Sequence, residues 1–469
     1  MPEPAYTPPP DLVDRVLVPL CKQRGLVFSS SEIYGGINAL YDYGPLGVRL
    51  RRRIRDSWWR RMVDLRDDVE GIETSIIMNP EVWVASGHVA SFADPLVDCT
   101  RCGRRWREDH IAAERAARGK DATQRICPED DGPLTQARQF NLMFRTFLGP
   151  VEDDAAQVYL RPETAQGMFV NFANVLNATR RRLPFGIAQV GRSFRNEISP
   201  SNFIFRVREF EQMEMEYFIE PGSDDLWYEH WCGDRLAWFV DDLGVRREHL
   251  RLRAHASDEL SHYSSGTSDI EYRFPFGWGE LEGIAKRTDY DLRAHMERSG
   301  RDLSYFDDVE QRRYVPHVVE TAVGVDRIFI TLLCDAYDEE EVRGEKRVVL
   351  RLHPDIAPVQ VAVLPLSKRP ELCAVARRIE HGLRSEFSTA YDETQAIGRR
   401  YRRQDEVGTP LCVTVDFESL DDHAVTIRER DGMTQVRVAT DALAAALADQ
   451  LAAGRRRAAA RAQGAAGPA

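Results

Sequence analysis

A charged segment between residues 194 and 214 constrains this chain more than any other part of the sequence. Phe194-Arg195-Asn196-Glu197 is followed nine residues later by residues 206–214, with an aromatic ring at Phe210. The spacing suits two strands joined by a short loop. Cations, a carboxylate and an aromatic ring on such a pair can hold a nucleotide without a phosphate-binding loop. Each residue alone also fits a solvated surface, so the prediction of a nucleotide site rests on all of them together.

Two further regions frame this segment. Residues 45–64 are predicted to form an amphipathic helix, because Leu46, Leu50, Ile54, Trp58 and Met62 recur every fourth position among arginines. The following residues 71–80 are β-prone and end in a proline, which predicts a strand closed by that proline. Residues 141–345 alternate short strand-like runs with Gly-rich turns, as an antiparallel sheet does.

The pattern changes near residue 358. Residues 359–363, 413–415 and 425–427 alternate as strands, and an apolar stripe of helical period lies between them, formed by Leu372, Val375, Ile379, Leu383 and Phe387. Strands alternating with helices predict a separate α/β domain over residues 358–453. Residues 454–469 are of low complexity, and we expect them to be disordered.

Composition bounds the possible functions. A chain of 469 residues with 43% hydrophobic residues is long enough for two to four domains. Its first residues lack the pattern of a signal peptide and its apolar runs are too short to span a bilayer, so we expect a cytoplasmic protein without membrane contact. The net charge of −12 argues mildly against nucleic acid as a partner, although clusters such as residues 399–403 could bind phosphates locally.

The motifs resemble those of class II aminoacyl-tRNA synthetases. The pattern F-R-x-E, loop, R-x-x-x-F-x-x-x-E is similar to motif 2, residues 45–80 resemble motif 1, and residues 320–327 resemble motif 3. Four strings, RPETAQG, FEQMEMEYF, HYSSGTSDIEYRFPFGWGELEGIA and IGRRYRRQDEVGTPLCVTVDF, extend the resemblance to homodimeric glycyl-tRNA synthetases, over about residues 10 to 445.

This resemblance implies an α+β fold, namely a class II antiparallel sheet with flanking helices plus a C-terminal α/β anticodon-binding domain. It implies ATP-dependent ligation of glycine to tRNA(Gly) through a glycyl adenylate, for protein synthesis, in a homodimer built on motif 1. The expected divisions are residues 1–94 and 141–345 for the catalytic domain, 95–140 for an insertion, and 358–453 for the anticodon-binding domain.

The resemblance also implies an ATP site. Arg195 would contact the α-phosphate and the amino-acid carboxylate, Arg206 the γ-phosphate, and Glu197 the adenine amino group. Phe210 would stack on one face of the base and Arg327 would cover the other. Fixed positive charge supplies such catalysis without a protein nucleophile, so Arg195 and Arg327 are the expected catalytic groups, with Glu280 holding Mg²⁺. The remaining expected ATP contacts are Asn196, Phe205, Val207, Arg208, Glu209, Leu281, Gly324, Val325 and Asp326.

A glycine site is implied beside it. Glu163, Glu214 and Glu320 would hold the ammonium group, and Arg107 with Arg195 would hold the carboxylate. Every competitor is larger than glycine, so exclusion suffices and no editing domain is demanded. The other expected contacts are Phe210, Glu211, Gln212, Met213, Thr321, Ala322, Val323 and Gly324. Ala322 stands where family members commonly have serine, so a hydroxyl that would help to fix glycine is absent.

Two peripheral sites are also predicted. Cys99 and Cys102 form half of a zinc ribbon, while Cys127 is followed by Asp130 where a fourth thiolate would stand. This set either holds zinc or is a metal-free remnant. In the C-terminal region Arg399, Arg400, Tyr401, Arg402 and Arg403 interleave an aromatic ring with cations, as a tRNA-binding surface requires. They could equally form a structural rim of the domain.

Two alternatives remain open at this point. A non-catalytic, synthetase-like RNA-binding or regulatory protein would be expected to lose its ATP-binding residues, whereas Arg195, Glu197, Arg206, Phe210, Glu280 and Arg327 are all present. A ligase for another small amino acid would differ in the amino-acid pocket and not in the ATP site.

Overall fold

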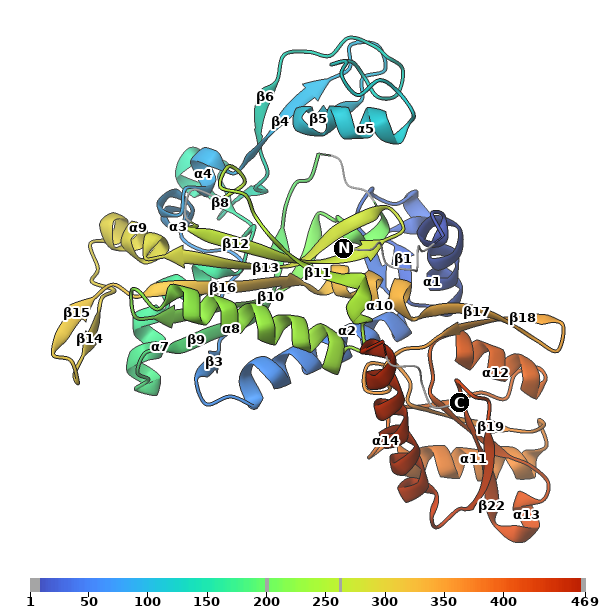
Figure 1. Cartoon of the computed structure of the whole chain (residues 1–469). Coiled ribbons are helices and arrows are strands. Elements are labelled where there is room, and N and C mark those ends of the chain that lie inside the picture. Colours follow the sequence, from blue (N-terminus) through green and yellow to red (C-terminus); the bar gives the residue numbers. More distant parts are fainter. Residues whose placement is uncertain (1–8, 199–201, 261–263, 465–469) are drawn as a thin grey trace.

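A large twisted sheet organises the first 350 residues of this computed structural model, which describes residues 9–198, 202–260 and 264–464 (Figure 1). In the described part it has seven strands in the order β11-β12-β13-β16-β10-β9-β3, all neighbours antiparallel except β3 beside β9. The predicted antiparallel sheet is therefore confirmed. Its strands are β3 (Val69–Gly71), β9 (Phe185–Phe194), β10 (Glu209–Ile219), β11 (Leu250–Ala254), β12 (Gly266–Phe274), β13 (Gly277–Thr288) and β16 (His317–Gly324).

Helices cover one face of this sheet and part of the other. On the first face lie α2 (Pro45–Trp59), α8 (Asp224–Ala237) and α10 (Val325–Ala336). Leu50, Ile54 and Trp58 of α2 are fully buried there, and a π-helical turn over Arg60–Asp64 extends the helix, which confirms the predicted helix. On the second face α6 (Ala165–Val170), α7 (Phe172–Thr179) and α9 (Tyr290–Ser299) cover one end only. The middle of that face is left for a pocket.

The prediction for residues 71–80 is wrong. The strand ends at Gly71, and Ile77 makes only an isolated bridge to Leu160. Pro80 begins α3 (Pro80–Ala85), where its missing N–H costs nothing, and the Asn79 side chain caps that helix by accepting the N–H of Glu81 at 3.0 Å. The proline therefore starts a helix, which α4 (His88–Ser91) follows.

The segment after α4 forms a small unit that projects from the open face of the large sheet, at the top of Figure 1. It contains a three-stranded sheet of β5 (Arg105–Arg107), β4 (Ala93–Asp98) and β6 (Arg138–Asn141), and helix α5 (Ile111–Ala117). Val97, Cys99, Trp106, Ile111 and Cys127 give it a core of its own. A unit with its own core can be inserted into a larger domain, which is consistent with the insertion predicted for residues 95–140.

Smaller elements complete this part of the chain. Helix α1 (Val18–Arg24) follows a π-helical segment over Leu12–Leu17. Four two-stranded ribbons are β1 (Val27–Ser29) with β2 (Tyr41–Tyr43), β7 (Arg145–Phe147) with β8 (Gln157–Tyr159), β14 (Tyr305–Asp307) with β15 (Arg312–Tyr314), and β17 (Tyr337–Val342) with β18 (Glu345–Leu350).

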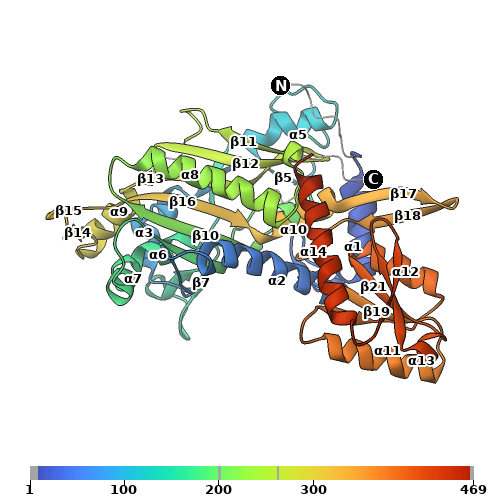
Figure 2. The same cartoon turned by 60° about the horizontal axis from the view of Figure 1, so that its bottom comes forward.

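The C-terminal region is a second domain with its own sheet and core, as predicted (Figure 2). Its strands β20, β19 and β21 run parallel, and β22 and β23 continue antiparallel. The elements are β19 (Val361–Pro365), α11 (Pro370–Leu383), β20 (Thr389–Tyr391), α12 (Ile397–Glu406), β21 (Leu411–Val415), α13 (Ser419–Asp422), β22 (Ala424–Glu429), β23 (Gln435–Ala439) and α14 (Leu443–Ala462).

The expected disorder of residues 454–469 is wrong for the nine residues 454–462, which continue α14; residues 465–469 lie outside the described part. Alanine is the strongest helix former, and the arginines of this segment find partners. Arg455 pairs with Asp355 at 2.9 Å, and Arg457 pairs with Glu429 at 3.0 Å. Ala462 is fully buried in the core of the large-sheet domain. The helix therefore joins the two domains.

Among the described residues, no helix combines the length and apolar character needed to cross a membrane.

Candidate active site

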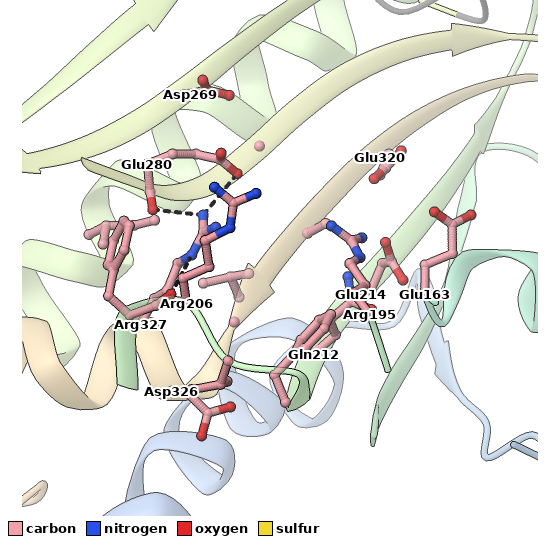
Figure 3. Close-up of a pocket in the computed structure, with 18 of the residues that line it drawn as sticks. Glu163, Arg195, Arg206, Gln212, Glu214, Asp269, Glu280, Glu320, Asp326 and Arg327 are labelled. Atoms are coloured by element: carbon pink, nitrogen blue, oxygen red, sulfur yellow. Dashed lines mark hydrogen bonds and ion pairs between the residues drawn. The ribbon is translucent and has the colours of Figure 1, made fainter. Parts of the chain in front are cut away.

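The pocket lies on the open face of the large sheet, lined by β10, β13 and β16 and by residues 204–207 from the segment between β9 and β10 (Figure 3). The start of α10 closes one side. Figure 3 shows two chemically different ends, with Arg206, Arg327 and Glu280 at one and Glu163, Glu214 and Glu320 at the other. The motif 2 segment thus forms two antiparallel strands and a loop, with Arg192 opposite Glu211 in the register.

Strand alternation selects the side chains that reach this pocket. Phe210, Gln212 and Glu214 of β10 face it, because alternate residues share one face of a sheet. In the register Gln212 stands opposite Gly324 and Glu214 opposite Ala322. These small residues of β16 leave the space in which a ligand can lie.

The basic end already contains ion pairs. Arg206 donates to Glu197 at 2.7 Å, and Arg327 lies 3.2 Å from the Glu280 carboxylate and donates to the Glu280 carbonyl at 2.9 Å. The Arg327 charge lowers the pKa of Glu280, so that carboxylate is anionic. An arriving triphosphate would exchange these contacts for its own oxygens.

Aromatic rings lie against the arginines. The Arg195 guanidinium lies 5.3 Å from the centre of the Phe210 ring, and Arg327 lies 4.8 Å from that of Phe205. Arg195 is further fixed by a hydrogen bond from its Nε to the Pro162 carbonyl at 3.0 Å. The remaining guanidinium nitrogens of Arg195 can therefore be directed at a ligand.

The acidic end is buried and tightly bonded. Thr164 donates its N–H to Glu214 at 3.0 Å and also donates its hydroxyl. Burial and the charges of Glu320 and Glu163 raise the pKa of Glu214 to about 8. Burial acts in the same direction on Glu163, but the His88 imidazole at 3.3 Å, the Arg287 charge and the Gln166 hydrogen bond together outweigh it and lower the pKa of that carboxyl. The Arg287 guanidinium holds Glu320, whose pKa burial raises.

The predicted residues divide into two groups. Those that line the pocket are Glu163, Arg195, Glu197, Phe205, Arg206, Val207, Phe210, Gln212, Glu214, Glu280, Leu281, Glu320, Ala322, Val323, Gly324, Asp326 and Arg327. Those that the structure does not bring to its lining are Arg107, Asn196, Arg208, Glu209, Glu211, Met213, Thr321 and Val325. Alternation explains Glu211 and Met213, which face the opposite side of β10: Glu211 pairs with Arg51 and Arg55 of α2, and Met213 is buried in the core.

Arg107 needs a separate correction. It lies on β5 of the inserted unit, where it pairs with Asp94 at 2.9 Å and with Asp109 at 2.6 Å. Its guanidinium is thus held by two carboxylates outside the pocket. Of the two arginines predicted to hold the glycine carboxylate, Arg195 is therefore the one that lines the pocket.

Other lining residues were missed from sequence: Ile204, His255, Thr267, Asp269, Gly283 and Ala285. Asp269 of β12 accepts a hydrogen bond from the His255 ring at 2.7 Å, and it stands opposite Gly283 of β13. Thr267 and Asp269 are two residues apart on one strand, so alternation along the GTSD string could have indicated both.

The four predicted metal ligands gather in the inserted unit. One ligand atom each from Cys99, Cys102, Cys127 and Asp130 lies within 4.8 Å of the others. The Cys102 and Cys127 sulfurs are 3.8 Å apart, close to the edge of a tetrahedron with metal–sulfur bonds of about 2.3 Å. The donor set and spacing therefore fit one tetrahedral metal ion.

The predicted tRNA-binding residues lie on α12, and Arg400 is not available to RNA. It is 1% exposed and donates to the carbonyls of Pro365, Leu366 and Asp392. It therefore clamps the ends of β19 and β20, so the prediction is wrong for this residue. Tyr401 bonds the Thr414 hydroxyl at 2.5 Å and is partly buried.

The other three arginines differ in accessibility. Arg402 lies 3.6 Å from Asp405, and Arg403 donates to Asp392 at 3.0 Å. Both side chains are partly exposed, whereas Arg399 is exposed at the first turn of the helix.

Comparison with known proteins gives the class. Residues 150–337 match the family model of the tRNA synthetase class II core domain (G, H, P, S and T), and residues 360–450 match that of the anticodon binding domain. A crystal structure of prolyl-tRNA synthetase from Cryptosporidium parvum, complexed with L-proline and AMP, superposes with a TM-score of 0.66 over 98% of this chain and 82% of that one. At 14% identity this likeness shows the fold alone. The fold and the site together define a class II aminoacyl-tRNA synthetase.

Three relatives narrow the class. Glycine–tRNA ligase from Thermobifida fusca is 52% identical over 451 residues, which cover 93% of this chain and 97% of that protein. The ligase from Bifidobacterium longum is 55% identical over 445 residues, 91% of each chain, and that from Streptomyces coelicolor is 53% identical over 456 residues, 94% of this chain and 99% of that one. The chain belongs to the glycine–tRNA ligase family.

Proposed function

We propose that this protein joins glycine to tRNA in two steps, forming glycyl adenylate from glycine and ATP and then transferring glycine to a ribose hydroxyl of tRNA(Gly). The observation that carries this proposal is one pocket that combines a basic aromatic end with a buried acidic end. The first end suits a triphosphate and a base, and the second suits an ammonium group. A non-catalytic, synthetase-like protein has no need of this arrangement.

At the basic end Arg195 and Arg206 would bind the α- and γ-phosphates, and Arg327 would cover the adenine that rests on Phe210. Negative charge grows on the α-phosphorus as the glycine carboxylate attacks, so Arg195 would act chiefly by electrostatic stabilisation. Mg²⁺ prefers carboxylate and phosphate oxygens, and when bound it would neutralise the phosphates. Glu280 is proposed to hold it, and Asp269 on the neighbouring strand offers a second carboxylate.

At the acidic end Glu163, Glu214 and Glu320 would hold the glycine ammonium. Gly283 stands opposite Ala322 in the register, so this part of the site is built from residues without long side chains. The hydroxyl missing at Ala322 would be compensated by the charges of the glutamates.

A direct test is ATP–pyrophosphate exchange with glycine, alanine, serine and proline as separate substrates. We expect exchange with glycine at least about tenfold above the others, because a single methylene in a close-fitting site already changes binding by about 1–3 kcal/mol. Equal exchange with alanine would favour a ligase for another small amino acid. Absence of exchange with any amino acid would favour a non-catalytic protein.

We also propose a homodimer and a cytoplasmic location. Val48 on α2, in the motif 1 region, is 53% exposed, and Ile33 and Tyr34, which precede this region between β1 and β2, are 88% and 87% exposed, so these residues offer apolar surface that a second copy would cover. Charging of tRNA serves translation, which supports a cytoplasmic location for this protein.

We propose that Cys99, Cys102, Cys127 and Asp130 hold a structural zinc ion. We expect metal analysis of the purified protein to find about one zinc per chain, and Cys127→Ser to lower this content. Cys232→Ser is the control, because Cys232 is buried in the large-sheet domain and should leave the zinc content unchanged. A metal-free wild-type protein would identify the cluster as a remnant.

The proposed tRNA-binding surface lies where the parallel strands β19 and β21 end. Ligands of α/β domains bind at the carboxyl ends of such strands. Phe417 follows β21, is 47% exposed, and has the Arg369 guanidinium 5.9 Å from its ring centre. Arg399 lies in the first turn of α12, which follows β20, and Arg403 of its last turn donates to Asp392 just after β20, so both lie towards the same edge.

Phe417→Ala should raise the KM for tRNA about tenfold, since stacking of a base on an aromatic ring contributes about 1–3 kcal/mol. Glycine-dependent pyrophosphate exchange, which uses no tRNA, should stay normal. Val436→Ala on β23 is the matched control. Val436 is 45% exposed in the same domain, but β23 is separated from β21 by β22 in the sheet. Normal charging by Phe417→Ala would place the RNA contact elsewhere.

A further inference from the structure

A buried carboxyl group lies directly behind the acidic end of the pocket. Glu216 shares the pocket face of β10 with Glu214 and stands opposite Glu320 of β16. It is fully buried, and neither of its carboxyl oxygens has a hydrogen-bond partner within the described residues. Oxygen atoms of Glu214, Glu216 and Glu320 lie within 4.8 Å of one another. The proposed glycine contacts do not include Glu216, so its presence there needs another reason.

The hydrogen bonds distinguish the three carboxyl groups. Glu214 accepts both the N–H and the hydroxyl of Thr164, and Glu320 accepts from the Arg287 guanidinium. Donors of this kind favour the anion. Glu216 has no such donor, and three buried negative charges at this separation oppose one another. Burial, and next the Glu320 charge, raise the pKa of Glu216 well above its usual range.

The surrounding charges do not offer Glu216 a cation of its own. Arg287 of β13 bonds Asp291 of α9 at 2.8 and 2.9 Å in addition to Glu320, and its charge, which also acts on Glu216, does not offset the effect of burial there. His295 of α9 contacts Gln166 at 2.8 Å, and burial lowers its pKa, which favours the neutral ring.

The other nearby histidine, His88, pairs with Glu163. The cationic groups of the neighbouring elements are thus already engaged with other carboxylates.

We propose that Glu216 is a positioning residue of the glycine site that works in its neutral, protonated form. It fills the space behind Glu214 and Glu320 without adding a negative charge, so that these two carboxyl groups can be anionic when the ammonium group is bound. Its O–H is available to Glu320, the residue opposite it, and fixes the orientation of that carboxylate. This inference rests on the proposed placement of glycine.

The test compares Glu216→Gln with Glu216→Leu in glycine-dependent pyrophosphate exchange. Glutamine keeps the shape and an N–H donor but cannot ionise, so the KM for glycine should stay within about threefold of the wild-type value. Leucine removes the donor and should raise that KM about tenfold or more, with the KM for ATP unchanged. Glu380→Gln replaces a buried glutamate of the C-terminal domain and serves as the matched control, with normal exchange.

The pH profile gives a readout that a merely structural role would not move. The pKa of Glu214 is raised to about 8 in the ligand-free protein. Glu214 must lose this proton to face the ammonium, so the wild-type KM for glycine should fall as pH rises towards about 8. Glu216→Gln should retain this dependence, because Glu216 does not change its protonation on binding. Loss of the dependence in this variant would show that Glu216 itself titrates, and would overturn the proposal.

Two other outcomes are decisive. If Glu216→Gln raises the KM for glycine as much as Glu214→Gln does, Glu216 acts as an anion and the inference fails while the glycine site stands. The inference also fails, and the glycine site stands, if metal analysis finds a second cation that is lost in Glu216→Gln. If Glu214→Gln leaves the KM for glycine unchanged, the proposed placement of glycine fails first. Should Glu216→Leu not fold, the glutamine variant and its pH profile still decide.

Discussion

Arg195→Ala should lower glycine-dependent pyrophosphate exchange by about 10²- to 10³-fold, the loss that follows removal of one fixed donor from a site of developing negative charge. Arg195 lines the pocket, and its position is fixed by the Phe210 ring, whose centre is 5.3 Å away, and by the Pro162 carbonyl. Alanine removes charged hydrogen bonds that contribute about 1.5–3 kcal/mol each. Because the growing charge on the α-phosphorus is the target, kcat should fall more than affinity for either substrate.

The matched control is Arg192→Ala. Arg192 lies near the end of β9, three residues before Arg195, is 54% exposed at its side chain and pairs with Glu209 outside the pocket. It should retain exchange within about threefold, since exposed ion pairs contribute little. Wild-type exchange in Arg195→Ala, with correct folding shown by circular dichroism, would remove Arg195 from the ATP site. An equal loss in both variants would indicate damage to β9 instead.

Glu163→Gln should raise the KM for glycine by about 10- to 100-fold and leave the KM for ATP unchanged. Glutamine keeps the shape of the side chain but removes the charge that would face the ammonium, and a hydrogen bond to a charged group contributes about 1.5–3 kcal/mol. Glu163 is the appropriate member of the acidic end for this test, because His88, Arg287 and Gln166 together overcome the effect of burial and keep its pKa low. Its charge is therefore present across the working pH range.

The stability of the variant gives the control for this prediction. A carboxyl group with a lowered pKa in the folded protein stabilises it above its unfolded pKa, and that stability is lost as pH falls through the folded value. Glu163→Gln should remove this contribution at neutral pH, together with the His88 contact at 3.3 Å. A lower melting temperature with an unchanged KM for glycine would assign Glu163 to a structural ion pair.

Much of the fold followed from local pattern. The four-residue period of residues 45–64 determined a helix with one buried stripe, and the spacing within residues 194–214 indicated two strands joined by a loop. The change of period near residue 358 separated the second domain. The family strings placed Arg195, Arg327 and the three glutamates in one site, and the structure brings all five to one pocket.

Local pattern also had clear limits. Pro80 was read as the end of a strand, although a proline is as well suited to the first turn of a helix, and only the Asn79 cap distinguishes the two. Residues 454–462 were expected to be disordered because their composition is simple. Their helix forms where it can dock, with Ala462 buried against the other domain.

The sequence by itself thus determined the period of each main element, the two domains and the family of the protein, because these depend on neighbours within a few positions and on contiguous motifs. Only the tertiary structure decided which charged residues are free to act. Arg107 is engaged by Asp94 and Asp109, Arg400 by the carbonyl groups that end two strands, and Glu216 lies opposite Glu320. Most of these partners are distant in sequence, and a charge's role is set by the partners and burial that the fold gives it.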